Sequence, residues 1–225
     1  MIPRRMRDPA YRESQKAALA EKRMLPFKDF ASRLRAEHPE LPGMPDIAPH
    51  YDPSSARVLS LSSNPGPRAG GIEGSGFLSV QNDDASAERL LHVYASAGLT
   101  REHVVPWNAF PWYVHDRMPD GLPVEHIEEG VQALRRLLEL CPNVVSIVAH
   151  GGDAHRSVRM LRSTRYVGPF VRHRGIHTWD TRHTSNRAFI LAPQQRQDAF
   201  DDMVETYRQA MVHADLRPNE SLSLR

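Results

Sequence analysis

The chain has 225 residues, a length that suits one α/β domain with an extension and allows a sizeable hydrophobic core to be buried. Its one cysteine, Cys141, excludes an intramolecular disulfide, a four-cysteine zinc site and an iron–sulfur cluster. The sequence has no run of eighteen apolar residues and no apolar stretch behind its basic N-terminus. We therefore expect no membrane span and no secretion signal, and a reducing cytoplasmic location.

The formal net charge is only +2, but positive charge is unevenly distributed along the chain. Eight arginines and a single acid, Asp180, fall between residues 154 and 187. Such a concentration is typical of proteins that bind nucleic-acid phosphates. The alternative interpretation is compositional, because arginine outnumbers lysine 26 to 3 in the whole chain.

The N-terminal part differs in composition from the rest. Residues 9–37 predict one or two helices, and Pro26 argues against a single unbroken one. Residues 39–55 contain five prolines and predict an extended linker lying over the domain. We therefore expect a helical extension and linker over residues 1–50, one domain over 51–215 and a tail over 216–225.

Strand-like and helix-like segments alternate after this linker. Predicted strands lie at 57–62, 103–107, 143–149 and 175–179, and predicted helices at 85–97, 124–138, 153–162 and 195–213. This alternation predicts a three-layer α/β/α sandwich with a central, mainly parallel, four-stranded sheet. Binding sites in such sheets form outside the carboxyl ends of the strands.

Three places follow the ends of these predicted strands. Residues 62–67 (Ser-Ser-Asn-Pro-Gly-Pro), continuing to 76–79, follow the first strand, 107–113 the second and 183–187 the fourth. They contribute amides, hydroxyls and an imidazole, and no carboxylate. This combination favours recognition of a neutral polar heterocycle and stabilisation of an anion.

These segments resemble those of a known family. Residues 63–67 (Ser-Asn-Pro-Gly-Pro) resemble the first motif of the uracil-DNA glycosylase superfamily in its Asn-Pro-Gly form, and 183–187 (His-Thr-Ser-Asn-Arg) resemble its second, usually His-Pro-Ser with an intercalating loop. Residues 76–79 (Gly-Phe-Leu-Ser) are similar to the segment that supplies the ring stacking on the extruded base. The order holds from about residue 51 to 204, which implies that 51–215 form the catalytic domain.

The resemblance implies a monofunctional DNA glycosylase that hydrolyses the N-glycosidic bond of uracil, or of other deaminated bases, in base excision repair. Asn64 would orient the attacking water and His183 would stabilise the negative charge of the departing base. The implied base pocket consists of Phe77, Asn108, Pro65 and Gly66. The implied DNA contacts are Ser185, Asn186 and Arg187.

The same resemblance implies no metal and no cofactor, a partner that is DNA containing damaged bases, and a monomer in the nucleoid-associated cytoplasm. All three lysines precede the core, so no Schiff-base lyase step is expected. Thr184 replaces the usual proline of the second motif and leaves the position of His183 open.

Other interpretations of these residues remain open. Asn64 can simply form a turn, Phe77 can belong to the core, Asn108 can cap the strand end and His183 can be a surface residue. Trp107, Phe110 and Trp112 are predicted to pack in the core, and His150–His155 is predicted to be a strand-to-helix turn with Asp153 near the N-cap.

Two other functions compete with the glycosylase. The first is a catalytically silent DNA- or nucleotide-binding protein of the same fold. The second is a metal-dependent hydrolase built on His173, His177, Asp180 and His183. The segment that holds His173 and His177 is predicted to be a strand, which would separate their Cα atoms by roughly 13 Å.

Overall fold

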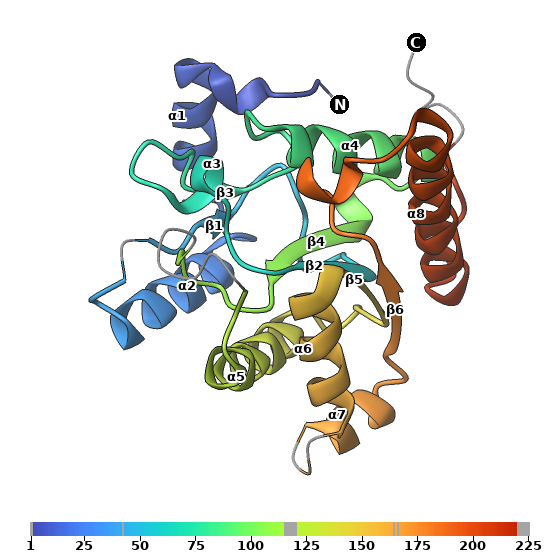
Figure 1. Cartoon of the computed structure of the whole chain (residues 1–225). Helices are drawn as coiled ribbons and strands as arrows, with labels where there is room; N and C mark the ends of the chain where they lie inside the picture. Colours follow the sequence, from blue (N-terminus) through green and yellow to red (C-terminus); the bar gives the residue numbers. More distant parts are fainter. Residues whose placement is uncertain (1, 42, 115–120, 164, 166, 220–225) are drawn as a thin grey trace.

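A four-stranded parallel sheet organises the computed structural model, which describes residues 2–41, 43–114, 121–163, 165 and 167–219 (Figure 1). The order of its strands is β4 (Val104–Asn108), β2 (Val58–Ser62), β5 (Ser146–His150) and β6 (His177–Thr181). All three neighbouring pairs are parallel. The predicted parallel sheet is confirmed, and so are its four strands to within three residues.

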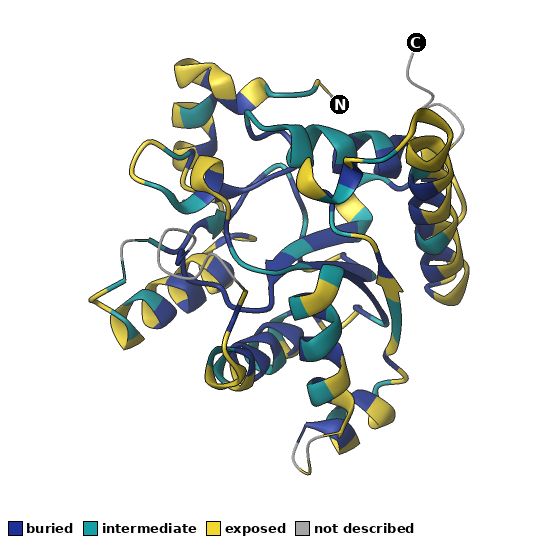
Figure 2. Ribbon diagram, in the orientation of Figure 1, coloured by how far each residue is buried: buried dark blue, intermediate teal, exposed yellow. Residues whose placement is uncertain are grey.

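Helices cover both faces of the sheet. On one face α4 (Ala85–Ala97) packs against α8 (Pro193–His213), which also contacts β5 and β6. On the other face α5 (Val124–Leu140) packs against α6 (Gly151–Ser163), which contacts β2 and β5. The result is the predicted three-layer α/β/α sandwich. Figure 2 shows the central strands buried and the outward sides of the helices exposed.

Local chemistry sets the ends of α4 where the sequence predicted them. The carboxylate of Asp84 accepts hydrogen bonds from the backbone N–H groups of Ser86 and Ala87, both at 2.9 Å. Gly98 ends the helix with a φ of 75°, a conformation that costs glycine little.

The N-terminal extension consists of η1 (Arg5–Arg7) and two helices, α1 (Pro9–Ala18) and α2 (Leu25–Glu37). The break predicted around Pro26 is confirmed, because this proline lies in the first turn of α2. Met6, Tyr11, Phe27 and Leu34 join the same hydrophobic core as the sheet. The extension therefore packs directly on the domain.

The proline-rich stretch is more structured than the predicted linker. Within it, β1 (Asp46–Ile47) pairs in parallel with β3 (Phe77–Leu78), and Tyr51 is buried. Arg23 of the extension donates to the carbonyls of Pro49 and Tyr51, both at 2.6 Å. The proline-rich stretch forms no helix that could pair its own carbonyl groups. The guanidinium of Arg23 provides the hydrogen bonds that two of these carbonyls would otherwise lack.

Several short elements were not predicted: α3 (Pro67–Gly70), α7 (Gly168–His173), η2 (Arg101–His103) and η3 (Arg187–Phe189). The helix α7 corrects the prediction that His173 lies in a strand, since this residue ends α7 and β6 begins only at His177. Of the predicted tail, residues 220–225 lie outside the described residues. No helix in the described ranges combines the length and apolar character needed to cross a membrane.

Candidate functional site

A cleft of about 740 Å³ opens at the carboxyl ends of the central strands. Most of the residues predicted for the site line it: Asn64, Pro65, Gly66, Asn108, His183, Ser185 and Arg187. Parallel strands bring these segments to one edge of the sheet although they are far apart in the sequence. The volume falls in the range of small-molecule sites.

Asn64 follows β2 on a short turn that leads into α3. Its neighbour Ser63 has the closest polar contact of the segment, because its Oγ lies 2.6 Å from Oδ2 of Asp153. The same Oγ lies 3.2 Å from Oδ1 of Asn64. The Asn64 amide also has a long contact, 3.4 Å from Nδ2 to the carbonyl of Pro65. A neutral amide held in this way can orient a water molecule, but it cannot deprotonate one.

Asn108 ends β4 directly opposite Ser62 of β2. The backbone N–H of the next residue, Ala109, donates to the carbonyl of Ser62 at 2.7 Å, which fixes the strand end. Asn108 is only 3% exposed, and its Nδ2 is buried with no hydrogen-bond partner among the described residues. Unpaired buried donors are rare and costly, so this N–H₂ group is suited to a carbonyl supplied by a ligand.

His183 lies on the loop after β6 and presents a neutral ring to the cleft. Burial lowers its pKa below the ordinary value, although the nearby Asp153 carboxylate raises it. Its Nδ1 accepts a hydrogen bond from the backbone N–H of Ser185 at 3.0 Å. The neutral ring therefore carries its proton on Nε2, which makes this nitrogen a hydrogen-bond donor.

Gly151 allows the close approach of the His183 ring. Its φ is +80°, and a Cβ atom at this position would lie 2.9 Å from the Cβ of His183. A side chain here would strain the backbone and push against the imidazole. The glycine at the start of α6 thus helps to set where the donor nitrogen lies.

Arg89 of α4 holds the His183 loop from the side. Its guanidinium donates to the carbonyl of Thr184 and, at 3.2 Å, to Oδ1 of Asn186. It also stacks over the ring of Phe189 at 4.1 Å. The loop is therefore fixed even though Thr184 stands where the family motif has proline. Nothing in the sequence pointed to Arg89, because the pairing joins residues almost a hundred positions apart.

Two predicted site residues lie elsewhere. Phe77 is 1% exposed in the hydrophobic core and is not among the cleft-lining residues, so its ring offers no stacking face to a base in this structure. The strand pairing of β3 with β1 turns this ring inward, and Leu78 and Ser79 line the cleft instead. Asn186 is exposed outside the cleft and accepts its hydrogen bond from Arg89.

The expectation of a cleft without carboxylates was wrong. Asp84 and Asp153 both line it. Asp84 is occupied as the cap of α4, whereas Asp153 lies in the first turn of α6 and contacts Ser63 and, at 3.2 Å, Arg156. The sequence offered one indication that Asp153 lies at the site, namely its position just after the third predicted strand. The turn-like sequence around it favoured a purely structural role instead.

Two histidines near the end of β5, His150 and His155, are tied to the fold. Nε2 of His155 lies 3.1 Å from the carbonyl of Ala149 and 2.9 Å from that of Thr181, so this side chain bridges the ends of β5 and β6. His150 is fully buried, and its Nε2 lies 2.7 Å from the hydroxyl of Tyr207. In the described part of the chain no group of three or more histidine, cysteine or acidic residues could hold a metal ion.

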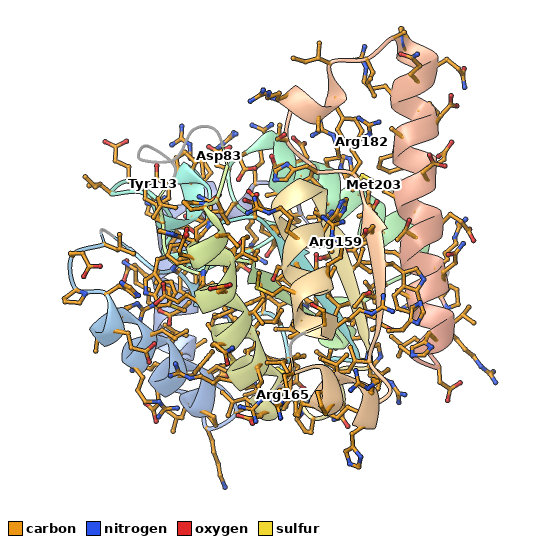
Figure 3. All side chains as sticks on the ribbon, turned by 60° about the horizontal axis from the view of Figure 1, so that its bottom comes forward. Asp83, Tyr113, Arg159, Arg165, Arg182 and Met203 are labelled. Carbon is orange, nitrogen blue, oxygen red and sulfur yellow. The ribbon has the colours of Figure 1, made fainter. Side chains whose placement is uncertain are left out.

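The arginine-rich segment does not form one surface around the cleft. Arg187 lines the cleft, while Arg174 donates to the carbonyls of Leu138, Cys141, Pro142 and Val144 below α5. Arg159, Arg162 and Arg172 line a separate cavity of about 400 Å³ formed by α6, α7 and β6. In Figure 3 the labelled arginines Arg182, Arg159 and Arg165 lie one below the other along the view and do not gather at one place.

One family model matches most of the chain. The model of the Uracil DNA glycosylase superfamily matches residues 48–207, a range that contains every cleft-lining residue named above. A search of the curated proteins found no match to this chain.

Proposed function

The chain belongs to the uracil-DNA glycosylase superfamily, and from that premise we propose that it is a monofunctional DNA glycosylase acting in base excision repair. Its substrate would be DNA that contains uracil or another deaminated base. The observation that carries the proposal is a pair of neutral side chains that line one cleft: Asn108, whose buried Nδ2 has no partner among the described residues, and His183, whose Nε2 carries the ring proton. A pyrimidine with carbonyl oxygens on its edge matches this pair.

Recognition would require the base to leave the helix, because its glycosidic bond is inaccessible in a stacked duplex. The cleft of about 740 Å³ is large enough for one nucleotide. Nδ2 of Asn108 would donate to a carbonyl oxygen on the edge of uracil. Cytosine has an amino group at the corresponding position, so two donors would face each other and binding would weaken.

Bond cleavage would leave the electron pair of the glycosidic bond on the base. His183 would stabilise this growing negative charge by donating a hydrogen bond from Nε2. The deoxyribose would become oxocarbenium-like, and a water molecule held by Asn64 would form the new C1′–O bond and release its proton to solvent. Positioning of the water is sufficient, because the cation is already strongly electrophilic.

A lyase step would require an amine that attacks C1′. The three lysines of the chain, Lys16, Lys22 and Lys28, are exposed on the N-terminal extension and do not line the cleft. These positions favour simple hydrolysis. Arg187, which is exposed at the cleft, and Ser185 would contact the DNA around the extruded nucleotide.

The test is release of the base from oligonucleotides that contain uracil, hypoxanthine or xanthine, single-stranded and in duplexes, together with G:T mismatches. Abasic sites in a uracil substrate are the expected result, and Asn64→Ala or His183→Ala should each lower the rate by about 10²–10³-fold. Asn143→Ala, on an exposed loop before β5, is the matched control and should retain the wild-type rate.

A catalytically silent DNA-binding protein is the alternative, and the burial of Phe77 favours it, because the cleft has no aromatic ring from that segment. Tight, salt-sensitive binding of DNA without release of any base in the panel would establish this alternative and refute the glycosylase.

A further inference from the structure

We infer that Asp153 and Ser63 are positioning residues that orient the amide of Asn64, an inference that rests on the proposed glycosylase function. The three side chains come from two distant parts of the chain. Ser63 and Asn64 follow β2, whereas Asp153 belongs to the first turn of α6, about ninety positions later. All three line the cleft.

The contacts assign the direction of the hydrogen bonds. A serine hydroxyl has one proton to donate. The Ser63 oxygen lies 2.6 Å from Oδ2 of Asp153 and 3.2 Å from Oδ1 of Asn64. The shorter contact, to an ionised carboxylate, is the stronger bond and takes the proton. Towards Asn64 the same oxygen is then free to act only as an acceptor.

This direction fixes the amide of Asn64. An acceptor at 3.2 Å requires a donor, which the side chain provides when its N–H₂ group, rather than its oxygen, faces Ser63. The oxygen and nitrogen of an amide are interchangeable in shape, so the hydrogen-bond network decides between them. The resulting chain runs from Asn64 N–H to Ser63 Oγ–H to Asp153. It replaces the longer contact of 3.4 Å between the Asn64 N–H₂ group and the Pro65 carbonyl, and the Asn64 carbonyl oxygen then has no donor from Ser63 or Pro65.

The orientation has a chemical consequence. With its oxygen free, Asn64 accepts a hydrogen bond from the attacking water, which leaves a lone pair of the water oxygen directed at C1′. With the amide reversed, the N–H₂ group would donate to the water and occupy that lone pair. Asp153 thus acts on the water through two intervening side chains.

Asp153 is itself held in place. Its side chain is 17% exposed, and Oδ1 pairs with Arg156 at 3.2 Å while Oδ2 accepts from Ser63. Arg156 is anchored in turn by donating to the carbonyl of Leu122 at 2.9 Å. The carboxylate therefore has a fixed position from which it can accept the serine proton.

The kinetic test uses four variants of the full chain. Ser63→Ala and Asp153→Ala should each lower the single-turnover rate of base release by about tenfold or more, because the water loses its orientation. The Kd for a duplex with a tetrahydrofuran abasic analogue should stay within about twofold of wild type. Ser63→Thr keeps the hydroxyl and should retain the rate, and the Ser63→Ala/Asp153→Ala double variant should be no slower than either single variant.

A second measurement does not depend on turnover. In ¹⁵N-labelled protein, hydrogen exchange of the Asn64 side-chain amide should be slow in the wild type and in Ser63→Thr, which keeps the hydroxyl. It should be faster in Ser63→Ala and in Asp153→Ala. Equal exchange in all these proteins, or additive losses of rate in the double variant, would overturn the inference. If the wild type releases no base at all, the proposed function fails while the exchange measurement still decides the orientation of the amide.

Discussion

Asn108 combines deep burial with a donor that has no partner, and this combination predicts a conflict between stability and activity. Replacement by leucine, which has the same number and branching of side-chain heavy atoms but is larger, removes a buried unpaired N–H₂ group. We expect Asn108→Leu to raise the free energy of unfolding by about 1 kcal/mol or more, since such groups cost about 1–3 kcal/mol. Uracil release should be lost, because the variant cannot donate to the base.

Urea denaturation and the base-release assay on the same preparations check this prediction. Asn143→Leu is the control: it removes an exposed amide that has a partner, the carbonyl of Ser54 at 2.9 Å, and should not raise the free energy of unfolding. A destabilised Asn108→Leu protein would mean that the amide has a structural partner, and full activity would remove Asn108 from base recognition.

The neutral state of His183 predicts the acid limb of the pH–rate profile. Burial lowers its pKa below the ordinary value of about 6.5, so the ring stays neutral as the pH falls through 6.5 and is protonated only at lower pH. Protonation would break the hydrogen bond from the Ser185 backbone to Nδ1, which needs a lone pair. The rate of base release should therefore stay near its maximum at pH 6.5 and fall below it.

The Asp153 carboxylate raises the pKa of His183 against this effect of burial. Asp153→Ala should consequently shift the acid limb to a lower pH, in addition to reducing the maximal rate. Single-turnover rates between pH 4.5 and 8 measure both effects. An acid limb centred above pH 6.5 would contradict the assignment of a neutral, buried imidazole.

Between elements, the closest approach near the site is that of α5 to the end of β4. A Cβ atom on Gly130 would overlap the carbonyl oxygen of Ala109, the residue after Asn108. Gly130→Ala should thus destabilise the protein by about 2 kcal/mol or more, as overpacking commonly does. Because the clash falls on the backbone beside Asn108, base release should also decrease.

Gly152 provides the matched control, because a Cβ atom there would meet nothing within 4 Å. Gly152→Ala in the first turn of α6 should leave stability unchanged or raise it by about 0.4–1 kcal/mol. The comparison of the two variants by thermal or urea denaturation separates the clash from the general effect of replacing glycine in a helix. Similar stabilities for both would refute the proposed close packing.

At the scale of elements, the sequence predicts the main helices and strands well because each has a clear hydrophobic period. The bounds of α4 match the predicted range of 85–97, where a capping Asp84 and a terminal Gly98 also mark the ends. The β1–β3 pair could not be predicted in this way, since two-residue strands have no period to detect. The inward position of Phe77 follows from that unpredicted pairing.

The site, too, has features that the sequence predicts and features that it does not. Asn64, Asn108 and His183 could be predicted to share one cleft because each lies at or after the end of a strand, and parallel topology brings the ends of strands together. Arg89 and the contact between Ser63 and Asp153 depend on side chains that meet across distant parts of the chain, for which the sequence has no local signal. The strand-end residues define which chemistry is available, whereas Arg89 and the contact between Ser63 and Asp153 fix its geometry.

For the whole molecule, the structure separates positive charge at the cleft from positive charge elsewhere. Arg68 and Arg187 line the cleft and are exposed, whereas Arg159 lines the separate cavity of α6, α7 and β6. Each phosphate contact that is removed should lower the slope of log K against log salt concentration by about 0.9 in duplex DNA. Arginines of the arginine-rich segment carry the same charge, but we expect their substitution to have unequal effects on DNA binding, depending on whether they line the cleft.

Arg187→Ala should weaken DNA binding and reduce the salt slope by about one, because this guanidinium lies at the mouth of the cleft. Arg159→Ala removes the same charge from the same segment and should leave the slope unchanged. Fluorescence anisotropy with an abasic-analogue duplex at several salt concentrations measures both. Equal losses would indicate that the arginines act through the overall field of the protein, while a larger loss for Arg159→Ala would place the DNA on the α6–α7 surface and away from the cleft.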